Sequence, residues 1–340
     1  MNRFFKTLAA TAAALTLGYT GGALAQGKGE SVKFQDYPGI GNVLVRVAIQ
    51  KGYCEKNGIK CDLQMIPTSP LGVQAMMAKS IDSALAPTDA VNLAVQKGTK
   101  MKMVAGGQVS NILLMAVGNH IDAPNAAKGF PAMMQDLKGK KIGVAARGST
   151  VEIFASWMLT KAGMDPEKDV TFVAVGGVPT TYGALMSKQV DVVFSYDPLG
   201  AMCDTLKSCK TTWRADTDKQ PAEIYATNGG LVNQVFTQEY IDKNPHVIDA
   251  VIKSLKDADA FVNAPANFDE TLAIVQKYFK LEMPKGQEIL SASVKHAIDA
   301  QSLRAAINRK AVQANLDMTL TTKQVEKIMP LNDLIYDKAP

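Results

Sequence analysis

The sequence predicts an α/β protein with two similarly built lobes, and two observations lead to this fold class. Strand-like and helix-like segments alternate from residue 31 to residue 106, and the same alternation restarts at residue 141. In addition, the segment Pro70–Asp82 recurs as Pro179–Asp191, with five identical residues at a constant shift of 109 positions. Because such alternation is typical of a parallel sheet covered by helices, we expect one parallel sheet in each lobe.

The first lobe is predicted from the segments that follow residue 30. Short apolar runs indicate strands, and longer amphipathic runs that end at glycine indicate helices. The expected strands are Ser31–Gln35, Lys60–Ile66, Asp82–Leu85 and Met101–Gly106. The expected helices are Val43–Asn57, Pro70–Lys79 and Asp89–Gln96.

The second lobe is predicted to repeat this order. Its expected strands are Lys141–Ala145, Val170–Val175 and Val190–Ser195, and its expected helices are Val151–Ala162 and Thr180–Lys188. The helix from Val151 has the clearest end signals. Ser149 and Glu152 match a capping box, and Gly163 suits a left-handed C-terminal cap.

The chain after residue 237 is predicted to be helical, with helices at Pro245–Val262, Phe268–Tyr278, Lys285–Asp299 and Thr322–Lys327. This tail has no strands of its own, so we expect it to pack on the first lobe. The first lobe is then discontinuous, with residues 26–110 and 228–340, and the second lobe is 111–227. Two crossings, near Gly107–Leu113 and Tyr225–Gly230, would join them.

The composition is that of a folded protein, since 47% of the 340 residues are hydrophobic and 20% are charged. These values exclude disordered and collagen-like chains. The formal net charge is only +5, and no run of lysine and arginine with interleaved aromatic residues is present. Nucleic acid is therefore not an expected partner.

Residues 1–25 have the pattern of a secretory signal. Arg3 and Lys6 supply the positive start, Thr7–Tyr19 the apolar stretch, and Ala23–Ala25 the small–x–small cleavage pattern. The apolar stretch is shorter than the ~20 residues that a membrane-spanning helix needs. We expect cleavage between Ala25 and Gln26 and export to the periplasm.

The four cysteines are Cys54, Cys61, Cys203 and Cys209. Export would place them in an oxidising compartment, where disulfides persist. Four thiols allow three pairings, and we favour the two local pairs, Cys54–Cys61 and Cys203–Cys209. No metal site is expected, because the sequence has no C-x-x-C and its three histidines are not spaced with the cysteines.

No motif for catalysis is present in the sequence. The nucleophile elbow G-x-S-x-G, the zinc motif H-E-x-x-H, the P-loop and the dinucleotide-binding glycine pattern are all missing. His120, His246 and His296 have no nucleophile nearby in the sequence. We therefore expect a protein that is not an enzyme and that carries no cofactor.

Ligands of α/β sheets bind at the carboxyl ends of the strands, and the loops expected there are rich in Ser, Thr, Gly and Pro. If the two lobes face each other, these loops line one cleft. The expected ligand-binding residues, taken from these loops and from the crossings, are Tyr37, Gly39, Ser69, Thr88, Asp89, Ser110, Asn111, Arg147, Gly148, Ser149, Thr150, Tyr182, Tyr196, Asp197 and Asn228.

The segment Arg147–Thr150 has the sharpest chemistry among these loops. A helix N-terminus offers N–H donors and a partial positive charge to an anion, and Arg147 would add a bidentate clamp. The alternative is ordinary capping by Ser149, with Arg147 in solvent.

Three acidic residues and three tyrosines in these loops have either a structural or a ligand-binding role. Asp36, Asp89 and Asp197 either cap helices or join the lobes, or else one of them pairs with a ligand amine. Tyr37, Tyr182 and Tyr196 either close over the ligand or pack within their lobes.

Five segments carry a family resemblance in their order and spacing: Ser31–Gly52, Met76–Gly98, Leu137–Val170, Gly183–Pro198 and Tyr240–Val251. They resemble the periplasmic receptors of ABC importers for taurine, alkanesulfonates and nitrate, a family related to the thiamine-pyrimidine proteins of fungi. The resemblance implies a type II periplasmic-binding-protein-like fold, with two parallel-sheet lobes, a two-crossing hinge and a helical C-terminal tail on the first lobe.

The resemblance also implies a function. The protein would be a monomeric extracytoplasmic receptor that closes on a small organic anion or zwitterion, such as a sulfonate, a taurine-like solute or a carboxylate. It would deliver that solute to an ABC permease and its ATPase. The family places ligand contacts in the first-strand loop, at Thr88 and Asp89, near Ser110 and Asn111, and at Gly148–Thr150. Two alternatives stay open: a thiamine-pyrimidine-related binding protein or enzyme, and a ligand-sensing module for a membrane sensor.

Overall fold

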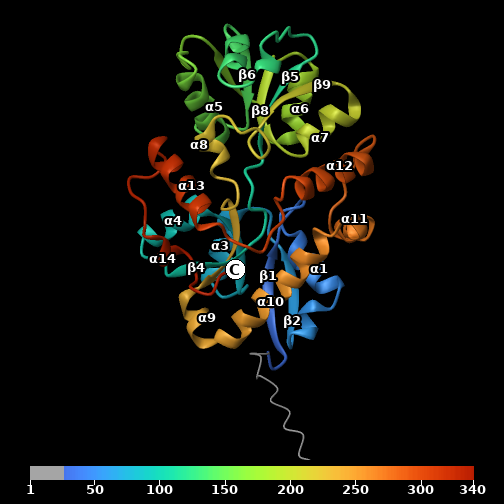
Figure 1. Cartoon of the computed structure of the whole chain (residues 1–340), viewed down its shortest axis with the longest axis vertical. Helices are drawn as coiled ribbons and strands as arrows, with labels where there is room; N and C mark the ends of the chain where they lie inside the picture. Colours follow the sequence, from blue (N-terminus) through green and yellow to red (C-terminus); the bar gives the residue numbers. More distant parts are fainter. Residues whose placement is uncertain (1–26) are drawn as a thin grey trace, which may run out of the picture.

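Two five-stranded sheets, each with its own helices, form two lobes that follow one another along the long axis of the molecule (Figure 1). The structure is a computed structural model that describes residues 27–340, so the expected signal segment and its cleavage site lie outside the described residues. Among the described residues, no helix combines the length and the apolarity that crossing a bilayer requires.

The sheet of lobe 1 has the strand order β2-β1-β3-β10-β4. Its strands are β1 (Glu30–Asp36), β2 (Ile59–Met65), β3 (Ser83–Pro87), β4 (Met101–Gly106) and β10 (Val232–Thr237). The sheet of lobe 2 has the order β7-β6-β8-β5-β9. Its strands are β5 (Leu113–Gly118), β6 (Lys141–Val144), β7 (Thr171–Ala174), β8 (Val192–Tyr196) and β9 (Cys209–Arg214).

Both sheets have the same topology, since β1, β2, β3, β4 and β10 correspond to β6, β7, β8, β9 and β5. The expectation of wholly parallel sheets is corrected here: β10 and β5 run antiparallel to their neighbours. These are the two strands that the chain enters after crossing from the other lobe. In each lobe the other strands end at the edge next to the hinge. A strand that enters from the hinge begins at that same edge and therefore runs in the opposite direction.

Lobe 1 begins with four helices, and the first expected helix is found in two pieces. These helices are α1 (Val43–Gln50), α2 (Tyr53–Lys56), α3 (Ser69–Met77) and α4 (Thr88–Gln96). The single helix expected over Val43–Asn57 is interrupted at Gly52, which has a left-handed φ of 68°. Glycine has no Cβ to oppose this conformation, so the chain turns there at little cost.

Lobe 2 has four α-helices of its own, α5 (Thr150–Lys161), α6 (Val178–Met186), α7 (Leu199–Leu206) and α8 (Ala222–Tyr225). Two short 3₁₀ turns, Ala126–Lys128 and Ala132–Leu137, precede β6. The repeat found in the sequence is confirmed at the ends of α3 and α6. Lys79 and Lys188, which occupy equivalent positions, both adopt a left-handed backbone, with φ of 59° and 61°.

The C-terminal helices are α9 (Gln238–Lys243), α10 (Pro245–Val262), α11 (Phe268–Tyr278), α12 (Gly286–Asp299), α13 (Arg309–Thr321) and α14 (Leu331–Leu334). The helix expected at Thr322–Lys327 is wrong, because α13 ends just before it. Helix α13 is not predicted from the sequence, although Asn308 caps it by accepting hydrogen bonds from the N–H groups of Lys310 and Ala311.

The C-terminal tail does not pack on lobe 1 alone. Leu290 and Val294 of α12 belong to the main core of lobe 1. Ile289 of the same helix belongs to an apolar cluster of lobe 2, and Met318 of α13 belongs to another. The tail therefore contacts both lobes.

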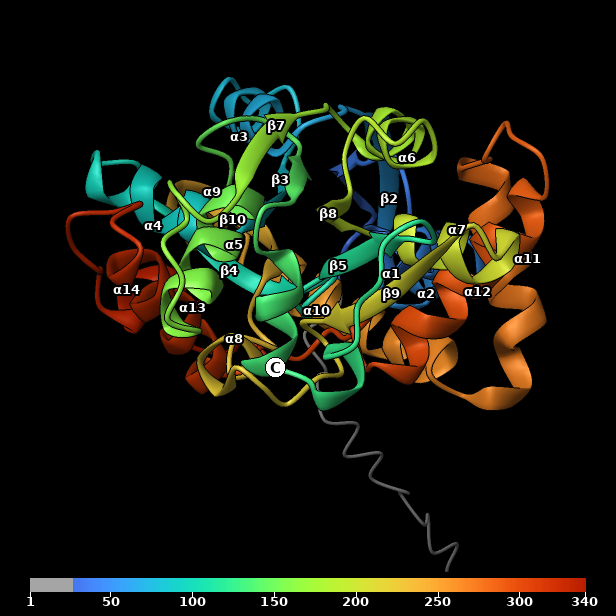
Figure 2. The same ribbon diagram turned by 90° about the horizontal axis from the view of Figure 1, so that it is seen from above.

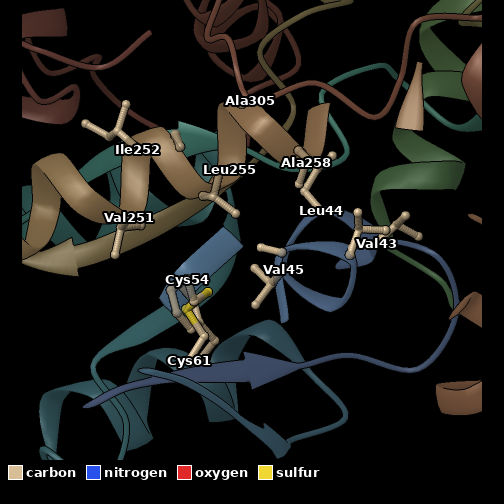
Figure 3. Close-up of a cluster of buried hydrophobic side chains, with 14 of the residues drawn as sticks. Val43, Leu44, Val45, Cys54, Cys61, Val251, Ile252, Leu255, Ala258 and Ala305 are labelled. Atoms are coloured by element: carbon tan, nitrogen blue, oxygen red, sulfur yellow. A yellow bond between two sulfur atoms is a disulfide. The ribbon is translucent and has the colours of Figure 1, made fainter. Parts of the chain in front are cut away.

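The core of lobe 1 contains one of two disulfides (Figure 3). Val45 of α1 and Leu255 of α10 are buried beside Cys54 and Cys61. The bond between these cysteines joins α2 to β2, and the bond Cys203–Cys209 joins α7 to β9 in lobe 2. Both expected local pairings are confirmed.

The hinge consists of the two expected crossings and a third segment. The N–H groups of Gly229 and Leu231, in the second crossing, both donate to the carbonyl oxygen of Val109 in the first crossing, at 2.9 Å. The tail then runs alongside, because the N–H of Val109 donates to the carbonyl oxygen of Ser302 at 2.7 Å. Gln108 and Leu303 also form an isolated antiparallel bridge.

Candidate functional site

The loop after β1 is held from inside lobe 1 by a buried arginine. Arg46 of α1 is inaccessible to solvent, and its Nε donates to Oδ1 of Asp36 at 3.0 Å. Its terminal nitrogens donate to the carbonyl oxygens of Tyr37 at 2.7 Å and Gly39 at 2.6 Å. Asp36 is thus neutralised within the lobe, and the backbone that carries Tyr37 is fixed. Gly39 has a φ of +101°, which favours glycine.

A second buried side chain ties together the ends of the strands of lobe 1. Nε2 of Gln35 donates to the carbonyl oxygen of Thr68 at 3.0 Å, and its Oε1 accepts from the N–H of Leu85 at 3.0 Å. A Cβ at Gly72 would overlap this amide, so the first turn of α3 needs glycine there. Ser69, an expected ligand contact, donates its hydroxyl proton to the carbonyl oxygen of Leu85 at 2.9 Å.

At the start of α4, the side chain of Thr88 is hydrogen-bonded within lobe 1, whereas the carboxyl group of Asp89 has no basic partner among the described residues. Thr88 is fully buried, and its hydroxyl donates to the carbonyl oxygen of Gly230 at 2.6 Å and accepts from Nδ2 of Asn233 at 3.2 Å. Asp89 is half-buried, and no basic side chain of residues 27–340 pairs with it. Burial raises the pKa of the Asp89 carboxyl above its usual value. The site therefore contains a desolvated carboxylate without a counter-ion.

The start of α5 differs from the expected capping box. Oε1 of Glu152 accepts from Nε of Arg147 at 2.9 Å, and its Oε2 accepts from the N–H of Gly148 at 2.8 Å. Ser149 occupies the N-cap position as expected, but the expected capping bond is wrong, because its side chain makes none and its Oγ is buried without a partner. Gly148 has a left-handed φ of +74°, and with this turn Glu152 reaches back to Gly148 rather than to Ser149. Thr150, the first residue of α5, is exposed.

The acid at the end of β8 is also paired within its own lobe. Both carboxylate oxygens of Asp197 accept from Nη1 of Arg214, at 3.3 and 3.1 Å, and the two side chains are 11% and 14% exposed. A Cβ at Gly200 would collide with that guanidinium. The hydroxyl of Tyr182 donates to Oγ of Ser208 at 2.8 Å, so it too serves lobe 2.

Two expected contacts from opposite lobes stand at the ends of strands that stop at the hinge. Tyr37 follows β1 in lobe 1, and Tyr196 ends β8 in lobe 2. Burial raises the pKa of the Tyr37 hydroxyl, and the charge of Tyr196 raises it further. Strand β1 runs parallel to β3, and β3 and β8 are antiparallel to β10 and β5, which begin just after the crossings. The loops after β1 and β8 therefore both lie at the hinge end of their sheets, where one lobe faces the other.

The expected contacts in the crossings serve the hinge. Oδ1 of Asn228 accepts from the N–H of Asn111 at 2.7 Å, and its Nδ2 donates to the carbonyl oxygen of Ala215 at 2.8 Å. Nδ2 of Asn111 donates to Oγ1 of Thr227 at 3.2 Å. Ser110 is 3% exposed, and its hydroxyl points to the tail, 3.4 Å from the carbonyl oxygen of residue 300.

The helices that begin at these loops supply the remaining polar groups. None of α4, α5 and α6 has a side-chain hydrogen bond that caps its N-terminus. Uncapped helix starts present N–H donors and a partial positive charge. The expected residues whose polar side chains are not committed to the fold are Tyr37, Asp89, Ser149, Thr150 and Tyr196, together with the terminal nitrogens of Arg147.

The two arginines that neutralise Asp36 and Asp197 are not predicted from the sequence. Arg46 stands alone in the otherwise apolar segment VLVRVAI of α1, and a lone arginine on an apolar face is a signal for a buried ion pair. Arg214 lies in a strand and gives no comparable signal.

Two lobes of identical strand order, joined by two crossings and with facing strand-end loops, define the class of type II periplasmic-binding-protein folds. Comparison with known proteins gives the family. Residues 37–276, which span both crossings, match the NMT1-like family, and the chain belongs to that family. It is 27% identical over 242 residues to a binding protein of Brucella abortus (strain 2308), covering 71% of this chain and 69% of the relative.

Solved structures show the same fold at low sequence identity. The periplasmic aliphatic sulphonate binding protein SsuA from Escherichia coli matches with a TM-score of 0.68 and 17% identity, over 90% of this chain and 92% of that one. The nitrate-binding protein NrtA from Synechocystis PCC 6803 matches with a TM-score of 0.54 and 14% identity, over 73% and 66%. The desulfurization enzyme DSZB has the fold as well, with a TM-score of 0.64 and 13% identity, over 91% and 97%.

Proposed function

We propose that this protein is the solute-binding component of an ABC importer, which captures one small organic solute by closure of its two lobes. The observation that carries this proposal is the pair of equivalent lobes whose strands end at the hinge, so that their strand-end loops face each other across two crossings. Relatives named as binding proteins and neighbours named as periplasmic receptors support it. The partners would be a membrane permease and its ATPase, and the receptor would work as a monomer.

The proposed location is the periplasm. The secretory pattern of residues 1–25 supports it. The two buried disulfides agree with it, because disulfides persist in oxidising compartments.

We further propose that the solute is a zwitterion. Asp36 and Asp197 are neutralised by Arg46 and Arg214, whereas Asp89 has no basic partner among the described residues. A carboxylate that is desolvated and unpaired favours a ligand amine, because a positive charge nearby stabilises its ionised form. The uncapped starts of α5 and α6 favour the acidic end of the same solute.

The test compares solutes that differ only in the amine. Taurine and ethanesulfonate share the sulfonate and the carbon chain, and β-alanine and propionate form the same kind of pair. Isothermal titration calorimetry at pH 7 should show taurine or β-alanine binding at least tenfold more tightly than its partner, which is about 1.4 kcal/mol.

Two variants locate the amine. Asp89→Asn should remove the difference within each pair, and Asp242→Asn, which alters an exposed carboxylate on α9, should preserve it. Equal binding of both members of each pair by the native protein would contradict the zwitterion assignment. Chemical turnover of a bound solute would contradict the receptor function and favour an enzyme.

A further inference from the structure

A groove of about 660 Å³ lies behind the hinge and is bordered by both lobes. Its walls come from both crossings, from the loop after β9, from α8, from the end of α12 and from the last residue, Pro340. In Figure 2, α8 and the C-terminus lie at one edge of the molecule, and α3 and α6 lie at the opposite edge. The groove and the loops that start α3 and α6 are therefore on opposite sides of the hinge.

One side-chain pair joins α12 to lobe 2 beside this groove, which Asp216 lines. Nε2 of His296, on α12, lies 2.7 Å from Oδ2 of Asp216, in the loop after β9, and donates its proton to that carboxylate. The neighbouring residues Val294 and Ala297 anchor α12 in the core of lobe 1. Asp216 follows the last strand of lobe 2. The contact is thus a hydrogen bond from α12, which packs on both lobes, to the last strand-end loop of lobe 2.

The front of the molecule has no comparable connection. Among the described residues, no hydrogen bond or ion pair joins the strand-end loops of lobe 1 (36–41, 68–72 and 87–90) to those of lobe 2 (147–150, 176–182 and 196–199). The lobes are linked by covalent chain at the hinge, by the tail helices at the flanks and by this pair at the back.

We propose that Asp216 and His296 form a latch that holds the lobes apart at the solute cleft, and that closure must open it. This inference rests on the proposed function, because it assigns a role within lobe closure. A rotation about the hinge that brings α3 toward α6 closes the cleft on that side. The same rotation moves the two lobes apart at the groove, on the opposite side of the hinge. The latch sets how much of the solute's binding energy is used for closure.

The environment of the pair lowers the free-energy cost of separating Asp216 from His296. The Asp216 side chain is only 5% exposed, yet its Oδ1 has no hydrogen-bond partner, whereas the His296 side chain is 23% exposed. A buried acceptor without a partner is costly, and water that enters during closure would satisfy it. The gain in hydration therefore offsets part of the cost of breaking the pair, and both states of the hinge stay accessible.

The experiment measures the lobe separation directly and needs no solute. Spin labels on Gln74→Cys in α3 and Gly183→Cys in α6 report the distance across the cleft, because both positions are exposed and the native cysteines are bonded. Pulsed dipolar spectroscopy then compares the native background with Asp216→Ala and with His296→Ala. Each background is first checked for folding by circular dichroism, and either latch variant alone is sufficient.

A matched control exists within lobe 1. His246 of α10 and Glu30 of β1 form the same kind of pair, at 2.6 Å, but both residues belong to one lobe. His246→Ala should leave the distance distribution unchanged.

The latch predicts a shift toward shorter distances in Asp216→Ala and a larger shift in His296→Ala, which leaves a buried carboxylate unpaired. Distributions that coincide with the native one, or that move to longer distances, overturn the latch. The proposed function fails separately, by the calorimetric comparison of solutes.

Discussion

Asp82 and Asp191 make the same hydrogen bond in the two lobes, although they are 109 positions apart. Oδ2 of Asp82 accepts from the backbone N–H of Lys33 at 2.8 Å, and Oδ2 of Asp191 accepts from the N–H of Lys141 at 2.9 Å. In return, the N–H of each aspartate donates to the carbonyl oxygen of the same lysine, at 2.9 Å in both lobes. Each aspartate thereby fastens the turn after its helix to a strand of its own lobe, β1 in lobe 1 and β6 in lobe 2.

This equivalence predicts similar losses of stability. Asp82→Ala and Asp191→Ala should each lower the free energy of unfolding by about 1–2 kcal/mol, because each removes one hydrogen bond to a charged acceptor near the surface. Urea-induced unfolding, followed by circular dichroism, measures both. A loss in one variant with none in the other would argue against equivalent roles, and Asp317→Ala, on the exposed face of α13, provides a reference.

Arg46, in α1, should be the most costly residue to replace among those that hold the loop after β1. Arg46→Met leaves the carboxylate of Asp36 buried without a partner and should lower the free energy of unfolding by about 3–5 kcal/mol. The double variant Arg46→Met/Asp36→Asn should recover part of that loss, since no buried charge remains. Urea unfolding of both variants is the measurement, and a double variant no more stable than the single one would count against the ion pair.

The sequence predicts the repeating architecture better than it predicts the roles of polar side chains. Periodicity and end signals place α5 and both lobes, because these signals are local. The break at Gly52 is missed, because a single glycine within a helical pattern is compatible with a continuous helix as well as with a turn. The antiparallel strands β5 and β10 follow from how the chain crosses the hinge, which no local pattern reports.

The roles of the expected site residues also depend on contacts that local sequence patterns do not report. Thr88, Asn111 and Asn228 have the polar side chains that a ligand would need, but the structure uses them to join the crossings to the lobes. Whether a polar side chain in a strand-end loop faces the cleft or the fold depends on partners distant in sequence. Asp197 and Arg214 illustrate this, because a loop residue is neutralised from a different strand.

The raised pKa of Asp89 predicts a pH-dependent cost to stability. Because burial favours the protonated form, the folded state binds the proton more tightly than the unfolded chain. Stability is then lost as the pH rises from below the unfolded pKa through the raised folded value, and the loss persists at neutral pH. Asp89→Asn should therefore raise Tm at pH 7 but change it little below about pH 3.5. Scanning calorimetry at both pH values checks this, and a lower Tm at pH 7 would contradict it.

Substitutions of Arg147 and of Glu152 should change the affinity for a solute with an acidic group in opposite directions. Arg147→Ala removes a positive charge beside the start of α5 and should weaken binding at least tenfold, about 1.4 kcal/mol. Glu152→Gln removes the negative charge that occupies the N–H of Gly148 and should strengthen binding. Titration calorimetry with taurine compares the two, and changes in the same direction would exclude α5 as the anion-binding end.

Small-angle X-ray scattering tests the central claim most directly. The protein is measured alone and with saturating amounts of the solute that gives the largest thermal shift among taurine, β-alanine, ethanesulfonate, propionate and nitrate. Closure of two lobes on one solute predicts a smaller radius of gyration in the saturated sample and a stoichiometry of one solute per chain. A radius of gyration that stays the same at saturation would contradict the account.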